Sequence, residues 1–313
     1  VVGRLPEFQK TYAQGSGGVF STTSGTSWGP KISELPNDAT YGGNTDNEYT
    51  QKFGKQQGKY YVPQRAAAGL DPWATPQAYD NAKEFFDTGI TWSNSLNVAQ
   101  MLDKSSYSIS LGNTHQDGII SSTGMDRYNV KVSADTKLTN NWSSGFTANY
   151  ITTSIDKAVT SGNGLLRTVY AAPPSYDLAG IPSHVDGNQY TQNSFRGSFD
   201  NAYWAMDNNK FTEDTNRFFG NVYASYQTDF GTTNHKLNAK YMVGVDAYTT
   251  HYVDSYGYGS NTGGGRGQIE NYGWTNATYN SLLTINYDWR INEDWGLNAV
   301  LGNEIIQSNR KKY

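Results

Sequence analysis

The sequence lacks cysteine, an excess of basic residues and long apolar runs. Without cysteine the chain forms no disulfide bond. A net charge of −4 and an isoelectric point near 5.6 argue against a nucleic-acid-binding protein, because no basic stripe is available to neutralise phosphates. Mean hydropathy is −0.68, and even the longest apolar runs, such as AAAGL at 66–70, are only a handful of residues. No transmembrane helix is therefore expected. The opening VVGRLPEFQK also lacks the pattern of a signal peptide.

Proline is missing beyond residue 182, since all nine prolines lie at or before Pro182. The composition is rich instead in small polar residues, with 33 glycines and 24 tyrosines. Such a composition is typical of an all-β protein with long polar loops, and the aromatic content of 14% argues against disorder. Composition alone would allow a soluble β-sandwich.

Alternation of apolar and polar residues is the main structural signal. Between 236 and 249 the odd positions, including Leu237 and Val243, are apolar, whereas the even positions, including Lys236 and Asn238, are mostly polar or small. A period of two predicts a strand with one apolar and one polar face. The same pattern predicts about eight strands, at roughly 90–99, 105–114, 125–136, 142–153, 216–230, 236–250, 279–291 and 295–306.

The lengths of the strands and of their connections favour a membrane barrel over a sandwich. At about 3.3 Å per residue and a tilt near 40°, 13 residues rise about 33 Å, more than the roughly 25 Å apolar band of an outer-membrane barrel. Short links are expected at 101–104, 137–141, 231–235 and 292–294, and long ones at 154–215 and 251–278. Short turns at one end and long loops at the other are typical of such barrels.

Two of the short links have the same design, KLTNNW at 137–142 and RINEDW at 290–295. Trp142 and Trp295 stand where a strand leaves its turn, on the parity of the apolar face, and Trp289 shares that parity. An indole suits the boundary between membrane and water, so these three residues are predicted to form an aromatic girdle. The alternative is that they cap the core of a soluble sandwich.

A family resemblance rests on five stretches that occur in order: LPEFQKTYAQGSGGVF (5–20), TSWGPKI (26–32), FFDTGITWSNSLNVA (85–99), YSISLGNTHQDGII (107–120) and YNVKVSADTKLTNNWS (128–143). Together they resemble the front part of the barrel in SusC-like (RagA/SusC family) TonB-dependent outer-membrane transporters. The resemblance is dense from 5 to about 155, and SWGPK and FFDTG are its most specific motifs. Later strands resemble barrel strands in general.

The resemblance implies an antiparallel transmembrane β-barrel of about 22 strands in the outer membrane of a Gram-negative bacterium. Residues 1–84 would be mostly an extracellular loop region with early barrel elements, and 85–313 about eight strands with their loops. The chain would thus be a segment of barrel wall without signal peptide, plug domain or remaining strands. Implied partners are a SusD-like lipoprotein, the TonB complex through the missing N-terminal region, outer-membrane lipid, and a glycan or oligopeptide substrate.

Candidate functional residues fall into two groups. The polar faces of the strands would line the lumen, where the side chains hydrate the interior, pair with one another or contact the plug: Arg127, Lys131, Asn149, Arg217, Asn221, Lys240, Asp246, Asp288 and Arg290. Aromatic residues expected in loops would stack on substrate or simply pack the loops together: Trp28, Trp73, Trp92, Trp204 and Trp274. Nothing in these groups selects one substrate.

Catalytic and metal sites find little support. GTSWG at 25–29 matches a nucleophile elbow around Ser27, but Pro30 follows at once and no helix is expected there. The four histidines are scattered without zinc-ligand spacing. Calcium at loop acids such as Asp177, Asp186 and Asp200 is conceivable but no EF-hand-like spacing supports it, so no cofactor and no enzyme activity are predicted.

Two other functional classes stay open at this point. One is a soluble, secreted β-sandwich that binds glycans through loop tryptophans. The other is a passive porin, which a plug domain and a TonB-contacting segment before Val1 would exclude.

Overall fold

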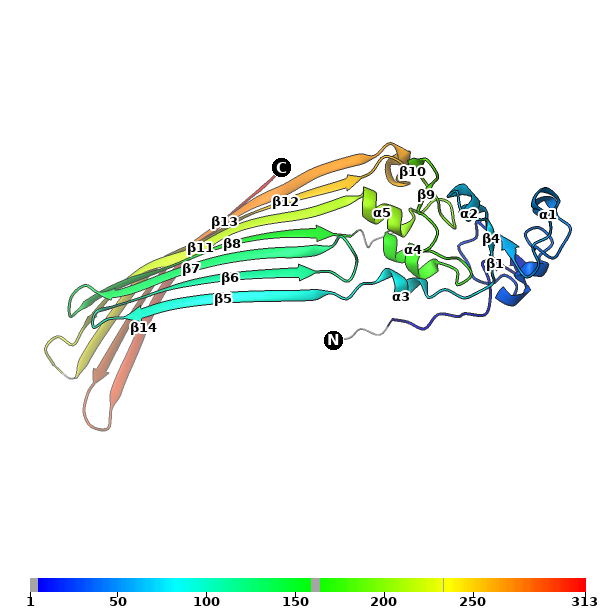
Figure 1. Ribbon diagram of the computed structural model, residues 1–313. Coiled ribbons are helices and arrows are strands. Elements are labelled where there is room, and N and C mark those ends of the chain that lie inside the picture. Colours follow the sequence, from blue (N-terminus) through cyan, green and yellow to red (C-terminus); the bar gives the residue numbers. More distant parts are fainter. Residues whose placement is uncertain (1–4, 159–163, 233) are drawn as a thin grey trace.

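A computed structural model describes residues 5–158, 164–232 and 234–313. Eight long strands form one antiparallel sheet in the order β14-β13-β12-β11-β8-β7-β6-β5. Their bounds are β5 Ile90–Met101, β6 Ser105–Asp117, β7 Gly124–Lys137, β8 Trp142–Lys157, β11 Lys210–Thr228, β12 His235–Tyr256, β13 Gln268–Arg290 and β14 Gly296–Lys312. Figure 1 shows the curved sheet with β5 and β14 at its two edges.

The connections divide between the two ends of the sheet as the sequence predicts. Short turns join β5 to β6, β7 to β8, β11 to β12 and β13 to β14 at one end, whereas the links from β6 to β7, from β8 to β11 and from β12 to β13 lie at the other end. The first of these ends is called the turn end below and the second the loop end. All eight predicted strands are present.

The loop expected at 251–278 is much shorter, because β12 continues to Tyr256 and β13 begins at Gln268. These extensions are rich in tyrosine and threonine, which favour strands, but they do not alternate between apolar and polar residues. Alternation reports one apolar face, whereas the hydrogen-bonded ladder needs no such face. The strands therefore extend beyond the alternating segments that predict them. The loop expected at 154–215 is likewise shorter, because β8 continues to Lys157 and β11 begins at Lys210.

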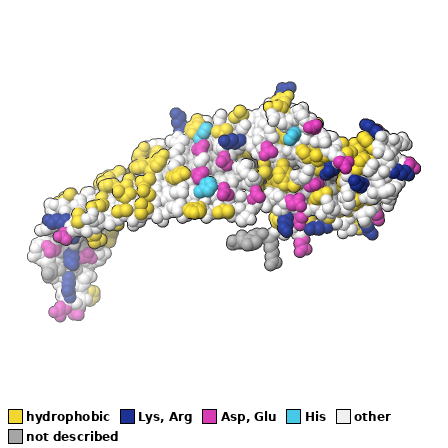
Figure 2. Space-filling view, in the orientation of Figure 1, with side chains coloured by type: hydrophobic (Ala, Val, Ile, Leu, Met, Phe, Trp, Pro, Cys, Tyr) yellow, Lys and Arg dark blue, Asp and Glu magenta, His cyan; other side chains and the backbone are white. Residues whose placement is uncertain are grey.

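Each strand contributes to the same two faces of the sheet. One register row joins Leu96, Leu111, Val130, Tyr150, Phe218 and Ala247, and another joins Phe146, Val222 and Val243. The side of the sheet that carries these rows is called the apolar face. Figure 2 shows hydrophobic side chains gathered over the strands, between a turn end that carries charged groups and a more polar loop half.

The single sheet rules out the two-layered sandwich for residues 90–312. Val243 and Leu297, which a sandwich would bury, are 41% and 49% exposed. In the described part of the chain no second large sheet covers them, because every other sheet has two short strands. The buried hydrophobic cluster lies outside the eight strands.

Apart from Ile120, that buried cluster belongs to a compact layer at the loop end, formed by residues 5–86 together with residues 164–209 and called the loop layer. Leu35 and Phe195, from the two segments, are fully buried in it. Its elements are β1 Gly15–Ser16, β2 Val19–Phe20, η1 Ile32–Asn37, α1 Glu48–Phe53, β3 Tyr60–Tyr61, α2 Pro63–Ala67, β4 Trp73–Ala74, α3 Asn81–Phe85, α4 Leu165–Ala171, β9 His184–Val185, β10 Asn188–Gln192 and α5 Ala202–Asn208. The 3-10 helix η2 (Thr262–Gly265) lies in the loop between β12 and β13.

Local chemistry accounts for the short helices of the loop layer. Asn47 caps α1 by accepting hydrogen bonds from the amides of Tyr49 and Thr50, and Thr50 returns a bond to the Asn47 amide. Proline begins α2 at its first position, where no amide is needed. At seven residues, α4 and α5 are the longest helices in the described ranges, too short to cross a bilayer.

Candidate functional site

All nine residues predicted to line a lumen lie on one face of the sheet, opposite the apolar face. Lys131 pairs with Asn149, Arg217 lies two positions from Phe219, and Phe219 pairs with both Asn149 and Asp246. Arg127, Asn221, Lys240, Asp288 and Arg290 share this parity along their own strands. This side of the sheet is called the polar face.

The polar face carries a cluster of aromatic and charged side chains near the loop end. Tyr252 on β12 and Tyr272 on β13 are register partners, and their rings stack with centroids 5.0 Å apart and planes 9° apart. Trp274 lies beside Tyr252 at 5.3 Å. Lys157 Nζ stands 4.4 Å above the Tyr252 ring and also pairs with Glu213 at 3.1 Å.

Arg310 completes this cluster from β14, with its guanidinium 4.9 Å from the Trp274 ring. Strand order places the members in sequence across the sheet, because β8, β11, β12, β13 and β14 are consecutive neighbours. We refer to Lys157, Glu213, Tyr252, Tyr272, Trp274 and Arg310 as the ring–cation cluster. Alternate polar-face positions of extended strands hold these side chains side by side.

A second group lies further from the loops. Arg217 Nε donates to Asp246 Oδ1 at 2.8 Å and its Nη2 to Asp246 Oδ2 at 2.5 Å, a bidentate pair. Lys240 Nζ rests 4.1 Å above the Tyr223 ring, and the Tyr223 hydroxyl donates to Asp135 at 2.6 Å.

Gly145 lets the Tyr223 ring cross β8 to reach Asp135. A Cβ at this position would lie 2.8 Å from the ring and 2.3 Å from the Asp135 carboxylate. Any larger residue would therefore push the two side chains apart.

The five tryptophans proposed as loop contacts are placed in four different ways. Trp73 and Trp204 are buried in the loop layer, where Trp204 Nε1 donates to the Gln189 carbonyl at 2.8 Å. Trp28 is 63% exposed at the loop layer surface. The expectation of a loop position is wrong for the other two: Trp92 lies in β5 on the parity of the apolar face, and Trp274 lies in β13 on the polar face.

Both repeated turns have the same hydrogen bonds. The amides of Leu138 and Thr139 donate to the Trp142 carbonyl, and the amides of Ile291 and Asn292 donate to that of Trp295. A side-chain oxygen of Thr139 or Asn292 accepts from the tryptophan amide at 3.0 or 2.8 Å. Trp142, Trp289 and Trp295 thus all stand at the turn end of the sheet, and their role as a membrane girdle stays a prediction.

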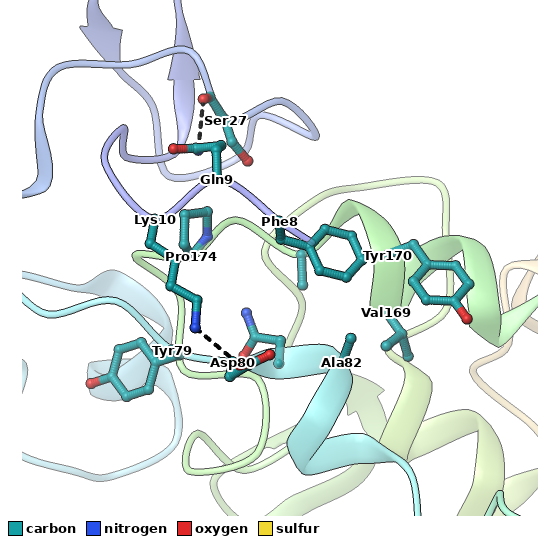
Figure 3. Close-up of a pocket in the computed structure, with 12 residues that line it drawn as sticks. Phe8, Gln9, Lys10, Ser27, Tyr79, Asp80, Ala82, Val169, Tyr170 and Pro174 are labelled. Carbon is teal, nitrogen blue, oxygen red and sulfur yellow. Dashed lines mark hydrogen bonds and ion pairs between the residues drawn. The ribbon is translucent and has the colours of Figure 1, made fainter. Parts of the chain in front are cut away.

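A pocket of about 70 Å³ within the loop layer lies between the segment around Phe8, α3 and α4, and is partly open to solvent. Figure 3 shows the ring of Phe8 beside that of Tyr170 and Lys10 reaching Asp80. Lys10 donates to the Asp80 carboxylate at 3.0 Å, and this hydrogen bond holds the pKa of Asp80 below its ordinary value. The pocket is small and its one ion pair is already formed.

Catalytic and metal chemistry gain no geometric support. Ser27 lies in a segment without a following α-helix, and its carbonyl accepts from Gln9 Nε2. No group of three metal-ligating side chains occurs within the described ranges. Calcium at Asp177, Asp186 or Asp200 remains an untested expectation, and the Asp200 carboxylate already accepts from Gln192, Ser260 and Asn261.

The sequence reasoning missed Lys157, Glu213, Tyr252, Tyr272 and Arg310. Four of them fall in segments taken for loops, and Arg310 follows the last predicted strand. Tyr248, Tyr252 and Tyr256 keep even spacing beyond the predicted end of β12, so continued parity was an available signal. The ring contacts themselves depend on register between strands.

No protein-family model matches this sequence, and no curated protein matches it. Solved structures do share its fold. Structures described as the RagAB peptide importer in the closed-closed and open-open states, and as the RagAB peptide transporter, each match with a TM-score of 0.59 and 16% identity. Each match covers 75% of this chain and 27% of the other, so the chain spans about a quarter of the length of those proteins. At this identity the similarity establishes the fold alone, which is that of a section of an antiparallel β-barrel.

Proposed function

We propose that the chain forms part of the barrel wall of a TonB-dependent outer-membrane importer of oligopeptides or glycans. The single observation that carries this proposal is the two-faced sheet, with apolar side chains exposed on one face and charged side chains on the other. An exposed apolar face of this extent needs an apolar surrounding, which the hydrocarbon core of a bilayer supplies. The polar face would then enclose the transport route.

The fold shared with structures described as a peptide importer supports oligopeptides as the substrate class. In the proposed mechanism a SusD-like surface lipoprotein captures substrate above the loop layer. TonB, driven by the inner-membrane proton gradient, then pulls on a plug in the lumen to open a path. The wall and the loop layer take part by positioning substrate and lid, without covalent chemistry.

Adjacent leucines on β13 offer a direct test in the full-length protein. Leu283 lies half-way along the apolar stretch of its strand, and Leu282 points to the opposite face, where it pairs with Met242 and Glu304. Leu283→Arg should destabilise the protein by about 2–4 kcal/mol, as expected for arginine near the bilayer midplane. Leu282→Arg should destabilise the protein much less, because the arginine side chain would lie in the polar interior of the barrel. Folded fractions after urea titration in lipid vesicles measure both.

Equal stability of the two variants would contradict a lipid-facing role for the apolar face. Extraction of the unmodified protein from cells without detergent would contradict it independently. A passive porin is distinguished by uptake that continues after the proton gradient is collapsed.

A further inference from the structure

We propose that the ring–cation cluster is a binding site for carboxylate groups on a linear substrate, with Arg310 as the principal contact and Lys240 as a second contact deeper along the polar face. The inference rests on the proposed function and names the chemical class that this route selects. It concerns ionic groups of the ligand rather than the stacking of sugar rings.

The first step is that the central ring of the cluster, Tyr252, is covered on both faces. Lys157 comes from β8 and β11 lies between it and β12, whereas Tyr272 comes from β13 on the other side of Tyr252. Both faces of the Tyr252 ring are therefore occupied. Arg310 covers one face of Trp274, and Tyr252 lies tilted by 44° against the same indole. Neutral sugars bind aromatic platforms through open ring faces, which Tyr252 does not present.

The second step concerns charge. Lys157 and Arg217 each have an acidic partner, Glu213 and Asp246. Across the described residues, no carboxylate lies within ion-pair distance of Arg310 or Lys240, and each cation rests on a ring instead. A ring quadrupole holds a cation without neutralising it.

Two acidic side chains on this face accept hydrogen bonds from neutral donors. Asp254 accepts from the Tyr272 hydroxyl at 3.1 Å, and Asp135 accepts from the Tyr223 hydroxyl at 2.6 Å. The tyrosine hydroxyls thus donate hydrogen bonds to the carboxylates, while the aromatic rings make cation–π contacts with the basic side chains. Of the four polar-face cations that rest on rings (Lys157, Arg217, Lys240 and Arg310), the last two remain for an external anion, and the guanidinium of Arg310 can bind a carboxylate in bidentate fashion.

The third step is spacing. Arg310 pairs in register with Asn276, which pairs with Tyr248, and Lys240 lies eight residues further along β12. At about 3.3 Å per residue this separates the two cations by about 26 Å along the strand direction. A ligand that touches both is an extended chain with carboxylates at intervals, either a peptide with acidic side chains or a uronate oligosaccharide.

Binding to the full-length protein tests this, with a decapeptide carrying glutamates, the same peptide carrying glutamines, an oligogalacturonate and a neutral oligogalactose as probes, since ten extended residues at about 3.3 Å each can span the two cations. Arg310→Gln should weaken binding of the carboxylate probe about tenfold, the loss expected for one charge-assisted hydrogen bond, and leave the glutamine peptide unchanged. Lys311→Gln is the matched control, because Lys311 adjoins Arg310 on the opposite parity of β14. Its binding should equal that of the unmodified protein.

Each possible result either supports or overturns the proposed carboxylate site. Tighter binding of the glutamate peptide or of the oligogalacturonate than of its neutral counterpart supports the inference, and whichever binds identifies the source of the carboxylate. Equal affinity for charged and neutral probes, tighter binding of the neutral sugar, or an Arg310→Gln loss that is the same for both peptides would overturn it. The proposed function would survive these results, since the Leu283 and Leu282 variants test that separately.

Discussion

Asp200 joins two parts of the protein through a single buried side chain. It is 8% exposed and accepts hydrogen bonds from Ser260 Oγ at 2.6 Å, from Gln192 Nε2 at 2.7 Å and from the amide and side chain of Asn261 at 2.7 and 2.9 Å. The glycine-rich link between β12 and β13 is thereby tied to the loop layer. Its glycines permit the tight path, since Gly259, Gly263 and Gly264 have positive φ.

Asp200→Ala should detach this link, because it leaves several buried donors without an acceptor, at a cost of about 1–3 kcal/mol each where water cannot replace it. Hydrogen exchange of residues 257–267 in the full-length protein measures the effect, which should be faster exchange there with little change in the strands. Asp207→Ala is the control, since Asp207 is exposed on the nearby helix α5. Unchanged exchange in Asp200→Ala would show that the carboxylate does not hold the link.

At the scale of elements, the two turns at 138–142 and 291–295 show how closely a short sequence can fix local geometry. A threonine or asparagine side chain accepts backbone amides two and three residues ahead, as in an Asx or ST turn. The following tryptophan closes the turn through its carbonyl. The similar sequences KLTNNW and RINEDW thus form the same hydrogen-bonded turn.

Asn292→Ala should loosen the second turn, because the amides of Asp294 and Trp295 lose their shared acceptor. The expected loss is about 0.5–2 kcal/mol, similar to that of a helix cap. Tryptophan fluorescence during urea unfolding of the full-length protein reports it. Asn292→Asp keeps an acceptor oxygen in place and should behave like the unmodified protein; a loss as large as that of alanine would mean that the amides are not what the side chain satisfies.

For the whole molecule, stability is divided between two kinds of packing. The sheet is held by continuous backbone ladders and leaves its apolar face exposed, whereas the loop layer has an ordinary buried core. That core combines residues 5–86 with residues 164–209, and the Gln14 side chain reaches the Phe195 carbonyl at 2.7 Å. The two segments are therefore expected to open together.

Leu35→Ala tests this coupling, since Leu35 is fully buried in the core. A loss of about 2–5 kcal/mol is expected for such a truncation. Limited proteolysis of the full-length protein should then cut within 164–209 as well as within 5–86, while the strands stay protected. Leu70→Ala, at a residue 36% exposed, should leave both segments resistant. Cleavage confined to 5–86 in Leu35→Ala would show that the segments fold independently.

The sequence by itself determined the eight strands, their two faces and the repeated turns, because period-two alternation and turn hydrogen bonds are properties of neighbouring residues. Leu237 and Val243, and likewise Lys240 and Asp246, lie on the faces that their parity assigns. The strands predicted from alternation were too short for β12 and β13, because both faces of these strands become polar or aromatic toward the loop end.

Only the tertiary structure decided which distant side chains meet. Lys157 and Tyr252 are brought together by strand order, and Gln14 and Phe195 by the packing of two segments that the strands β5 to β8 separate in the chain. The tertiary structure also buries Trp73 and Trp204 in the loop layer. Contacts of this kind depend on register and on the closure of long loops, and these arise from the sum of many pairings rather than from any local pattern.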